Sequence, residues 1–170
     1  MRLYIQRFDT PYGEMIIAVN EDGAVVRLVF PNEHERWAEE AARKHYDLVP
    51  DEERCVLALT QLDEYFQRKR QAFDLPLEPE GTPFQQTVWQ TLRTIPYGIT
   101  ITYRDLAERI GNAAAVRAVG QANGTNRIPI LIPCHRVIGT DGSLTGFGGG
   151  LALKEALLRL EGVTEQLLLF

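Results

Sequence analysis

Short apolar runs alternate with turn clusters over the first 30 residues. The runs cover residues 3–8, 15–19 and 24–30, and the connections between them are rich in Asp, Asn, Pro and Gly. Runs of this length, bounded by such residues, are typical of β-strands joined by hairpin turns. The pattern predicts a small antiparallel meander at the start of the chain.

Two helices are predicted after the meander, over about residues 33–45 and 51–68. In the second, the apolar side chains recur at a spacing of four, three and four residues, which places them on one face: Cys55, Leu59, Leu62 and Phe66. Cys55 is therefore expected to pack in the core, not to react. The proline-containing segment 75–81 is extended and predicts a boundary between an α/β domain, 1–80, and a second domain, 81–170.

The second domain opens on strong helix signals. Thr82 with Gln85 forms a capping box, Pro83 suits the first helical position, and a helix through Thr94 follows. Thr102 caps a further helix, with Asp105 three residues later. A tight turn at 111–112 then leads to a helix over 113–123, and this pair predicts a helix-turn-helix within a mostly helical domain.

The helix predicted over 113–123 is rich in Ala and Gly around a single charged residue, Arg117. Small side chains permit close approach to DNA but read little sequence, and they equally permit tight packing between helices. Charge favours the DNA interpretation modestly. Residues 1–80 carry 10 Lys and Arg against 17 Asp and Glu, a net charge of −7, whereas residues 81–170 carry 8 against 6, a net charge of +2.

A cysteine and a histidine stand side by side after the apolar run 128–132, in the segment Pro133–Gly139. Burial alone would raise the pKa of Cys134 above its free value of about 8.5 and leave the thiol inert. His135 and Arg136 are adjacent cationic candidates that could favour the thiolate. The pattern therefore indicates a nucleophilic cysteine.

These residues resemble the O6-alkylguanine-DNA alkyltransferases, also called methylated-DNA–protein-cysteine methyltransferases. The resemblance is carried by residues 133–139 together with 103–107, 117–120, Asn126 and 149–155, and it is close over about 82–162. It implies an α/β (α+β) fold, with an N-terminal ribonuclease H-like sheet and helices and a C-terminal winged-helix-like domain that binds DNA and accepts the alkyl group.

The resemblance implies a suicide repair reaction in which a flipped O6-alkylguanine loses its alkyl group to Cys134. His135 would accept the thiol proton, Glu161 would hold the imidazole, and Tyr103 would contact a base ring nitrogen. Asn126 would tie the helix-turn-helix to the reactive loop.

The remaining implied residues contact DNA or line the base pocket. Arg117 would enter the base stack. Phosphate or backbone contacts are implied for Arg104, Asn112, Thr140 and Arg136, and the base pocket for Pro129, Phe147 and Gly148. Phe147 and Gly148 stand where relatives carry Tyr and Ser, so side-chain hydroxyl donors are missing and larger alkyl groups have more space.

Two other function classes fit parts of this pattern. A cysteine hydrolase would use the same Cys134, His135 and Glu161 but turn over repeatedly, and a DNA-binding regulator would need no cysteine. No cofactor and no metal are expected, because Cys55, His34 and His45 match no structural zinc spacing. The expected partner is double-stranded DNA carrying O6-alkylguanine, with O4-alkylthymine a second candidate lesion. We expect a cytoplasmic monomer without membrane contact.

Overall fold

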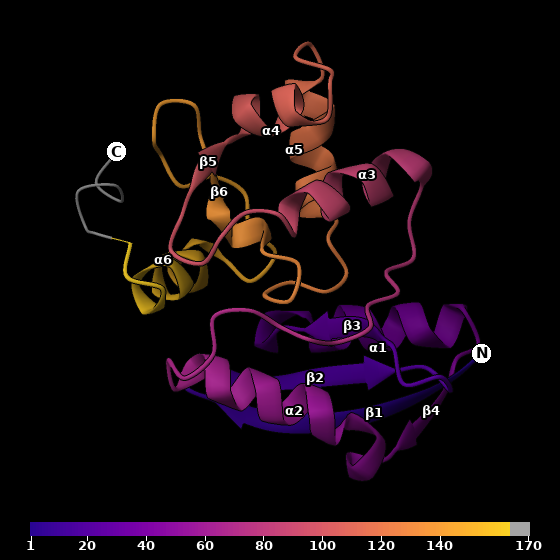
Figure 1. The fold of residues 1–170 in the computed structure, drawn as a ribbon. Coiled ribbons are helices and arrows are strands. Elements are labelled where there is room, and N and C mark those ends of the chain that lie inside the picture. The colour runs from indigo at the N-terminus through magenta and orange to yellow at the C-terminus, as the bar shows by residue number, and fades with distance from the viewer. Residues whose placement is uncertain (164–170) are drawn as a thin grey trace. The chain divides into compact units, whose positions relative to one another are not determined.

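The computed structural model describes residues 1–163 and divides the chain into two compact units, Met1–Glu80 and Gly81 onward. Figure 1 shows a sheet with helices in the first unit and a mostly helical second unit. This mixed architecture confirms the predicted fold class. None of the helices in residues 1–163 is long and apolar enough to cross a membrane.

The first unit is built on a four-stranded sheet of order β3-β2-β1-β4. β1 (Arg2–Thr10), β2 (Gly13–Val19) and β3 (Val25–Val29) form the predicted antiparallel meander. β4 (Asp47–Pro50) was not predicted, and it pairs in parallel with β1. Four residues that end in proline carry too little alternation to indicate a strand, so the sheet is mixed where a purely antiparallel one was expected.

Helices cover this sheet because β2 is buried on both faces. Its residues Met15–Val19 are all buried, and Ile16 and Ala18 pack with Trp37 of α1 (His34–Arg43). A 3-10 turn, η1 (Pro31–Glu33), precedes α1 and occupies the start of the longer helix predicted there.

The second helix of this unit, α2 (Glu52–Phe66), buries the predicted apolar face against the sheet. Cys55 is fully buried, and its Sγ lies 3.7 Å from the Tyr4 carbonyl oxygen. Burial raises the pKa of Cys55 to about 11, so it remains a thiol at neutral pH. The prediction of a packing role for Cys55 is confirmed.

The second unit begins with α3 (Pro83–Leu92), whose predicted capping box is present. Thr82 accepts from the Gln85 backbone amide at 3.2 Å, and the Gln85 side chain accepts from the Thr82 amide at 2.9 Å. α3 is anchored by Trp89, which donates from Nε1 to the Ala122 carbonyl at 2.8 Å. The helix thereby packs against α5 (Val116–Gly124).

The helix-turn-helix consists of α4 (Tyr103–Arg109) and α5. Gly111 supplies the turn with a φ of +79°, which non-glycine residues rarely adopt. The second helix begins at Val116, three residues later than predicted. The alanines at 113–115 offer no side-chain cap, and the Ala115 amide donates to the Asn112 carbonyl at 3.0 Å in a turn instead.

The reactive segment lies between the helix-turn-helix and the last helix. The apolar run 128–132 is buried, but it forms a tight turn and not a strand: the Ile132 amide donates to the Ile128 carbonyl at 2.9 Å, and Ile130 has a φ of +70°. A 3-10 turn, η2 (Cys134–Arg136), then leads into β6 (Val137–Ile138), which pairs in parallel with β5 (Ile101–Thr102). α6 (Leu151–Leu160) follows a glycine-rich loop.

Candidate active site

Cys134 occupies the first position of η2 and is 4% exposed. Its amide donates to the Ile132 carbonyl at 2.8 Å. Asn126 fixes the turn before it, donating from Nδ2 to the same carbonyl at 2.8 Å and accepting from the Ile128 amide at 3.0 Å. These bonds tie the end of α5 to the cysteine backbone, the position predicted for Asn126. The φ of Asn126 is not positive, so a strained loop conformation does not explain this residue.

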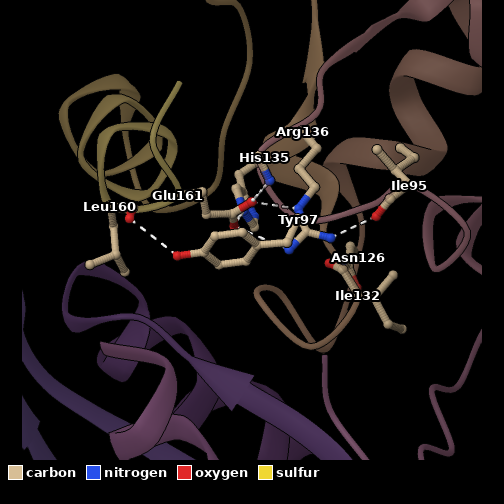
Figure 2. Close-up of polar contacts among 9 residues, drawn as sticks. Ile95, Tyr97, Asn126, Ile132, His135, Arg136, Leu160 and Glu161 are labelled. Atoms are coloured by element: carbon tan, nitrogen blue, oxygen red, sulfur yellow. Dashed lines mark hydrogen bonds and ion pairs between the residues drawn. The ribbon is translucent and has the colours of Figure 1, made fainter. Parts of the chain in front are cut away.

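His135 and Glu161 form a buried hydrogen-bonded pair, shown in Figure 2. His135 is fully buried and Glu161 is 5% exposed. The bond joins Nε2 of the imidazole to Oε2 of the carboxylate. A carboxylate only accepts, so Nε2 carries the hydrogen and Nδ1 of the neutral ring is the basic nitrogen. Nδ1 has no hydrogen-bond partner among the described residues.

Glu161 is held by more than the histidine. Arg136 donates from Nε to Oε1 at 2.7 Å and from Nη2 to Oε2 at 3.2 Å, while its Nη1 reaches the Ile95 carbonyl at 2.7 Å (Figure 2). The Gly98 amide also donates to Oε1, at 3.0 Å. Each carboxylate oxygen of Glu161 therefore accepts at least two hydrogen bonds.

The position of Arg136 corrects one expectation. A DNA contact was implied for it, but the residue is 6% exposed and its guanidinium is engaged with Glu161 and Ile95. A buried carboxylate without a cation would be costly, and Arg136 is the neighbour that supplies the charge. We therefore assign Arg136 to the reactive centre and not to the DNA surface.

Electrostatics in this cluster favour a neutral imidazole beside an ionised carboxylate. Burial lowers the pKa of His135, and Glu161 only partly opposes this shift. Burial acts to raise the pKa of Glu161, but the hydrogen bonds and charges of His135 and Arg136 outweigh it and lower that pKa well below its usual range. A neutral ring with a free Nδ1 is the form needed to accept a proton from a thiol.

Tyr103 begins α4, and its hydroxyl donates to the Thr145 carbonyl in the glycine-rich loop at 3.2 Å. Burial raises the pKa of Tyr103, so the phenol keeps its proton at neutral pH. A protonated phenol is a hydrogen-bond donor. This suits the predicted contact with a base ring nitrogen.

Lys154 is a functional candidate that sequence reasoning missed. It is fully buried in α6, and its Nζ donates to the Val137 carbonyl at 2.6 Å and the Thr145 carbonyl at 2.9 Å. Burial lowers the pKa of Lys154 to about 8, opposed by the charge of Cys134. The helical spacing from Lys154 to Leu157 and Leu158 puts it on the buried face, and that spacing is the signal that could have found it.

The residues predicted to contact DNA, other than Arg136, are exposed. They are spread over α4, the turn after it, α5 and the segment after β6: Arg104, Asn112, Arg117 and Thr140. Of the predicted pocket residues, Pro129 is buried in the turn before Cys134, whereas Phe147 is half-buried and Gly148 exposed in the glycine-rich loop. Among residues 1–163, no group of three or more His, Cys, Asp or Glu could hold a metal ion.

Comparison with known proteins identifies the family. Residues 3–79 match the ribonuclease-like domain of 6-O-methylguanine DNA methyltransferase, and residues 83–163 match the DNA binding domain of the same family. The constitutive methylated-DNA–protein-cysteine methyltransferase of Bacillus subtilis is 43% identical over 95% of this chain and 96% of its own length. The corresponding protein of Methanosarcina acetivorans is 44% identical over 94% and 99%.

Solved structures agree with this assignment. The O6-methylguanine methyltransferase of Mycobacterium tuberculosis superposes with a TM-score of 0.81 at 41% identity, covering 94% of this chain and 92% of that one. A structure described as Mycobacterium tuberculosis OGT in complex with DNA has the same TM-score at 40% identity, covering 93% and 92%. The chain thus belongs to the 6-O-methylguanine DNA methyltransferase family.

Proposed function

We propose that the protein repairs DNA by transferring the alkyl group of O6-alkylguanine to the sulfur of Cys134. The observation that carries the proposal is the tautomer of His135: its Nε2–H is committed to Glu161, which leaves a buried, basic Nδ1 on the residue next to the cysteine. Relatives named methylated-DNA–protein-cysteine methyltransferase, and the Mycobacterium tuberculosis homologue bound to DNA, support the same chemistry.

The reaction begins with proton removal. His135 Nδ1 accepts the thiol proton of Cys134, and the imidazolium that results is stabilised by the anionic Glu161. Arg136 keeps Glu161 ionised, so the proton stays on the histidine. Lys154 supplies a further cation that favours the thiolate.

The thiolate then attacks the alkyl carbon in line with the C–O6 bond. A sulfur–carbon bond forms, the carbon–oxygen bond breaks, and its electron pair remains on the departing guanine. Tyr103 hydrogen-bonds a ring nitrogen and stabilises this charge. The product is an S-alkylcysteine, so each molecule acts once.

The alkylated base must leave the helix, because O6 is not accessible to a buried thiol while the base is stacked. Arg117 projects from the exposed side of α5 and fills the vacated space. The small side chains around it permit close approach to a minor groove, and Arg104, Asn112 and Thr140 contact the backbone. The double-stranded substrate is bound by a monomer in this proposal, and O4-alkylthymine is a second lesion class.

The extrahelical base is placed between the turn that contains Pro129 and the loop that contains Phe147 and Gly148. A glycine at 148 leaves more space for alkyl groups than a serine would, so O6-benzylguanine is expected to react at a rate comparable with O6-methylguanine. Much slower transfer of the benzyl group would contradict a roomy pocket. We place the reaction in the cytoplasm, where reducing conditions keep Cys134 a thiol.

The test is the stoichiometry of transfer. Protein incubated with a duplex carrying radiolabelled O6-methylguanine should gain one labelled methyl group, located on the Cys134 peptide by mass spectrometry. C134A should gain none, whereas C55A, which removes the other thiol, should label fully. Repeated turnover would indicate a hydrolase, and absence of label on the wild-type protein would indicate a DNA-binding regulator.

A further inference from the structure

A buried amide next to the reactive cysteine is not used in this reaction. Asn123 lies in α5, is 2% exposed, and donates from Nδ2 to the Cys134 carbonyl at 3.4 Å. A carbonyl oxygen only accepts, so the nitrogen must face it, and this fixes the orientation of the amide. The oxygen, Oδ1, has no hydrogen-bond partner among the described residues. Burying an acceptor unpaired costs about 1–3 kcal/mol, which calls for an explanation.

The surroundings of Asn123 belong to the proposed base site. Gly120 lies one helical turn earlier on the same face of α5, and the Tyr103 ring covers it: a Cβ at Gly120 would lie 3.7 Å from Tyr103 Cδ1. The Asn123 side chain is in hydrogen-bond contact with the Tyr103 phenol. The amide therefore lies between the Tyr103 hydroxyl and the backbone of Cys134.

The neighbouring groups indicate which donor would satisfy Oδ1. Tyr103 is expected to contact a ring nitrogen of the extruded purine. Both nitrogens of the six-membered ring of guanine flank C2, and C2 carries an exocyclic amine with two N–H donors. A side chain beside the Tyr103 hydroxyl faces that edge of the base. Adenine and hypoxanthine have only a hydrogen at C2 and offer no donor there.

We propose that Asn123 is a specificity-determining residue whose Oδ1 accepts a hydrogen bond from the 2-amino group of the extruded guanine. This inference rests on the proposed alkyl transfer and deepens it by assigning recognition of the base. The unpaired acceptor is then satisfied only when guanine is bound. Sites that hydrogen-bond a substrate group discriminate strongly against analogues that lack it, because their own polar atom stays unpaired.

The experiment compares two substrates in each of four proteins. Second-order rate constants are measured for duplexes that carry O6-methylguanine or O6-methylhypoxanthine, which differ only in the 2-amino group, with active molecules titrated by total label. The proteins are the wild type, N123L, N123A and N123D. The ratio of the two rate constants within one protein does not depend on how much of that protein is folded.

The wild type should prefer O6-methylguanine, and N123L and N123A should lower that preference about tenfold, the worth of one good hydrogen bond. N123D retains an acceptor oxygen and should keep the preference, even where its negative charge slows both reactions. An exposed amide on the same helix provides a matched control, and Q121L should leave the ratio unchanged.

Equal preference in the wild type, N123L and N123A would overturn the role of Asn123 while leaving alkyl transfer intact. Failure of the wild-type protein to label on either duplex would instead overturn the proposed function. If N123L and N123A label on neither duplex, N123D decides: loss of its preference refutes the assignment, and retention supports it.

Discussion

The guanidinium of Arg136 holds both carboxylate oxygens of Glu161, with Nε 2.7 Å from Oε1 and Nη2 3.2 Å from Oε2. Glu161 in turn holds His135. Arg136 is therefore a positioning residue, which acts on the cysteine through two intermediaries. Its charge lowers the pKa of the imidazole directly and that of the carboxylate with it.

Replacing Arg136 should alter the pH dependence of transfer. In R136M the cation is lost, the pKa of His135 rises, and the acidic limb of the transfer rate should move to higher pH by about one unit. R136K retains the charge without the bidentate geometry and should fall between R136M and the wild type. Single-turnover rates from pH 5 to 9 provide the measurement. A uniform loss of rate with an unmoved limb would mean that Arg136 is only structural.

Glu161 should govern acid stability. Its folded-state pKa lies below the ordinary value of 4.5, so its contribution is complete above that pH and is lost as the pH falls further. E161Q leaves Arg136 buried without a carboxylate and should lower the free energy of unfolding by about 3–5 kcal/mol at pH 7. Urea unfolding at pH 7 and pH 4 should show this deficit shrink in acid.

Glu155 is the matched control for Glu161. It lies on α6 and pairs with Arg159 at 2.6 Å, but both side chains are at least 40% exposed. E155Q should cost less than about 1 kcal/mol, because exposed pairs contribute little. A deficit in E161Q no larger than that of E155Q would contradict a buried ion pair.

Lys154 should act in the opposite pH range. Its pKa falls from 10.5 to about 8 on folding, so between these values the unfolded chain binds more protons and stability rises with pH. K154M should remove this rise, seen as a flatter unfolding free energy between pH 8 and 10 than in the wild type. R159M on the exposed side of α6 should leave the rise in place. A rise that persists in K154M would assign it to another group.

The same substitution should slow the chemistry. Without the Lys154 cation the thiolate of Cys134 is less favoured, so alkylation of Cys134 by iodoacetamide at pH 7 should slow in K154M. R159M again serves as the comparison.

Arg117 should matter only where a base must leave a helix. In R117A, repair of duplex O6-methylguanine should slow at least about tenfold, whereas reaction with the free base O6-benzylguanine should be unchanged, because no stack has to be refilled. R109A removes an exposed charge from α4 and should affect the duplex reaction less. Similar losses on both substrates in R117A would refute the flipping role.

Local signals in the sequence determined much of the second unit. The capping boxes at Thr82 and Thr102 specify where α3 and α4 begin, since each satisfies amides within three residues of itself. The spacing in α2 likewise predicted the burial of Cys55. The segment around Cys134 and His135 indicated the chemistry because a nucleophile and its base are sequence neighbours.

Tertiary structure decided which side chains surround that chemistry. Arg136 was predicted to face DNA and instead turns inward to Glu161, 25 residues away, while the Cys134 carbonyl receives Asn123 from 11 residues away. Lys154 and the parallel strand β4 also depend on partners distant in the chain. Sequence spacing reports which face of an element is apolar, but a buried charge is stable only where the fold brings a partner to it.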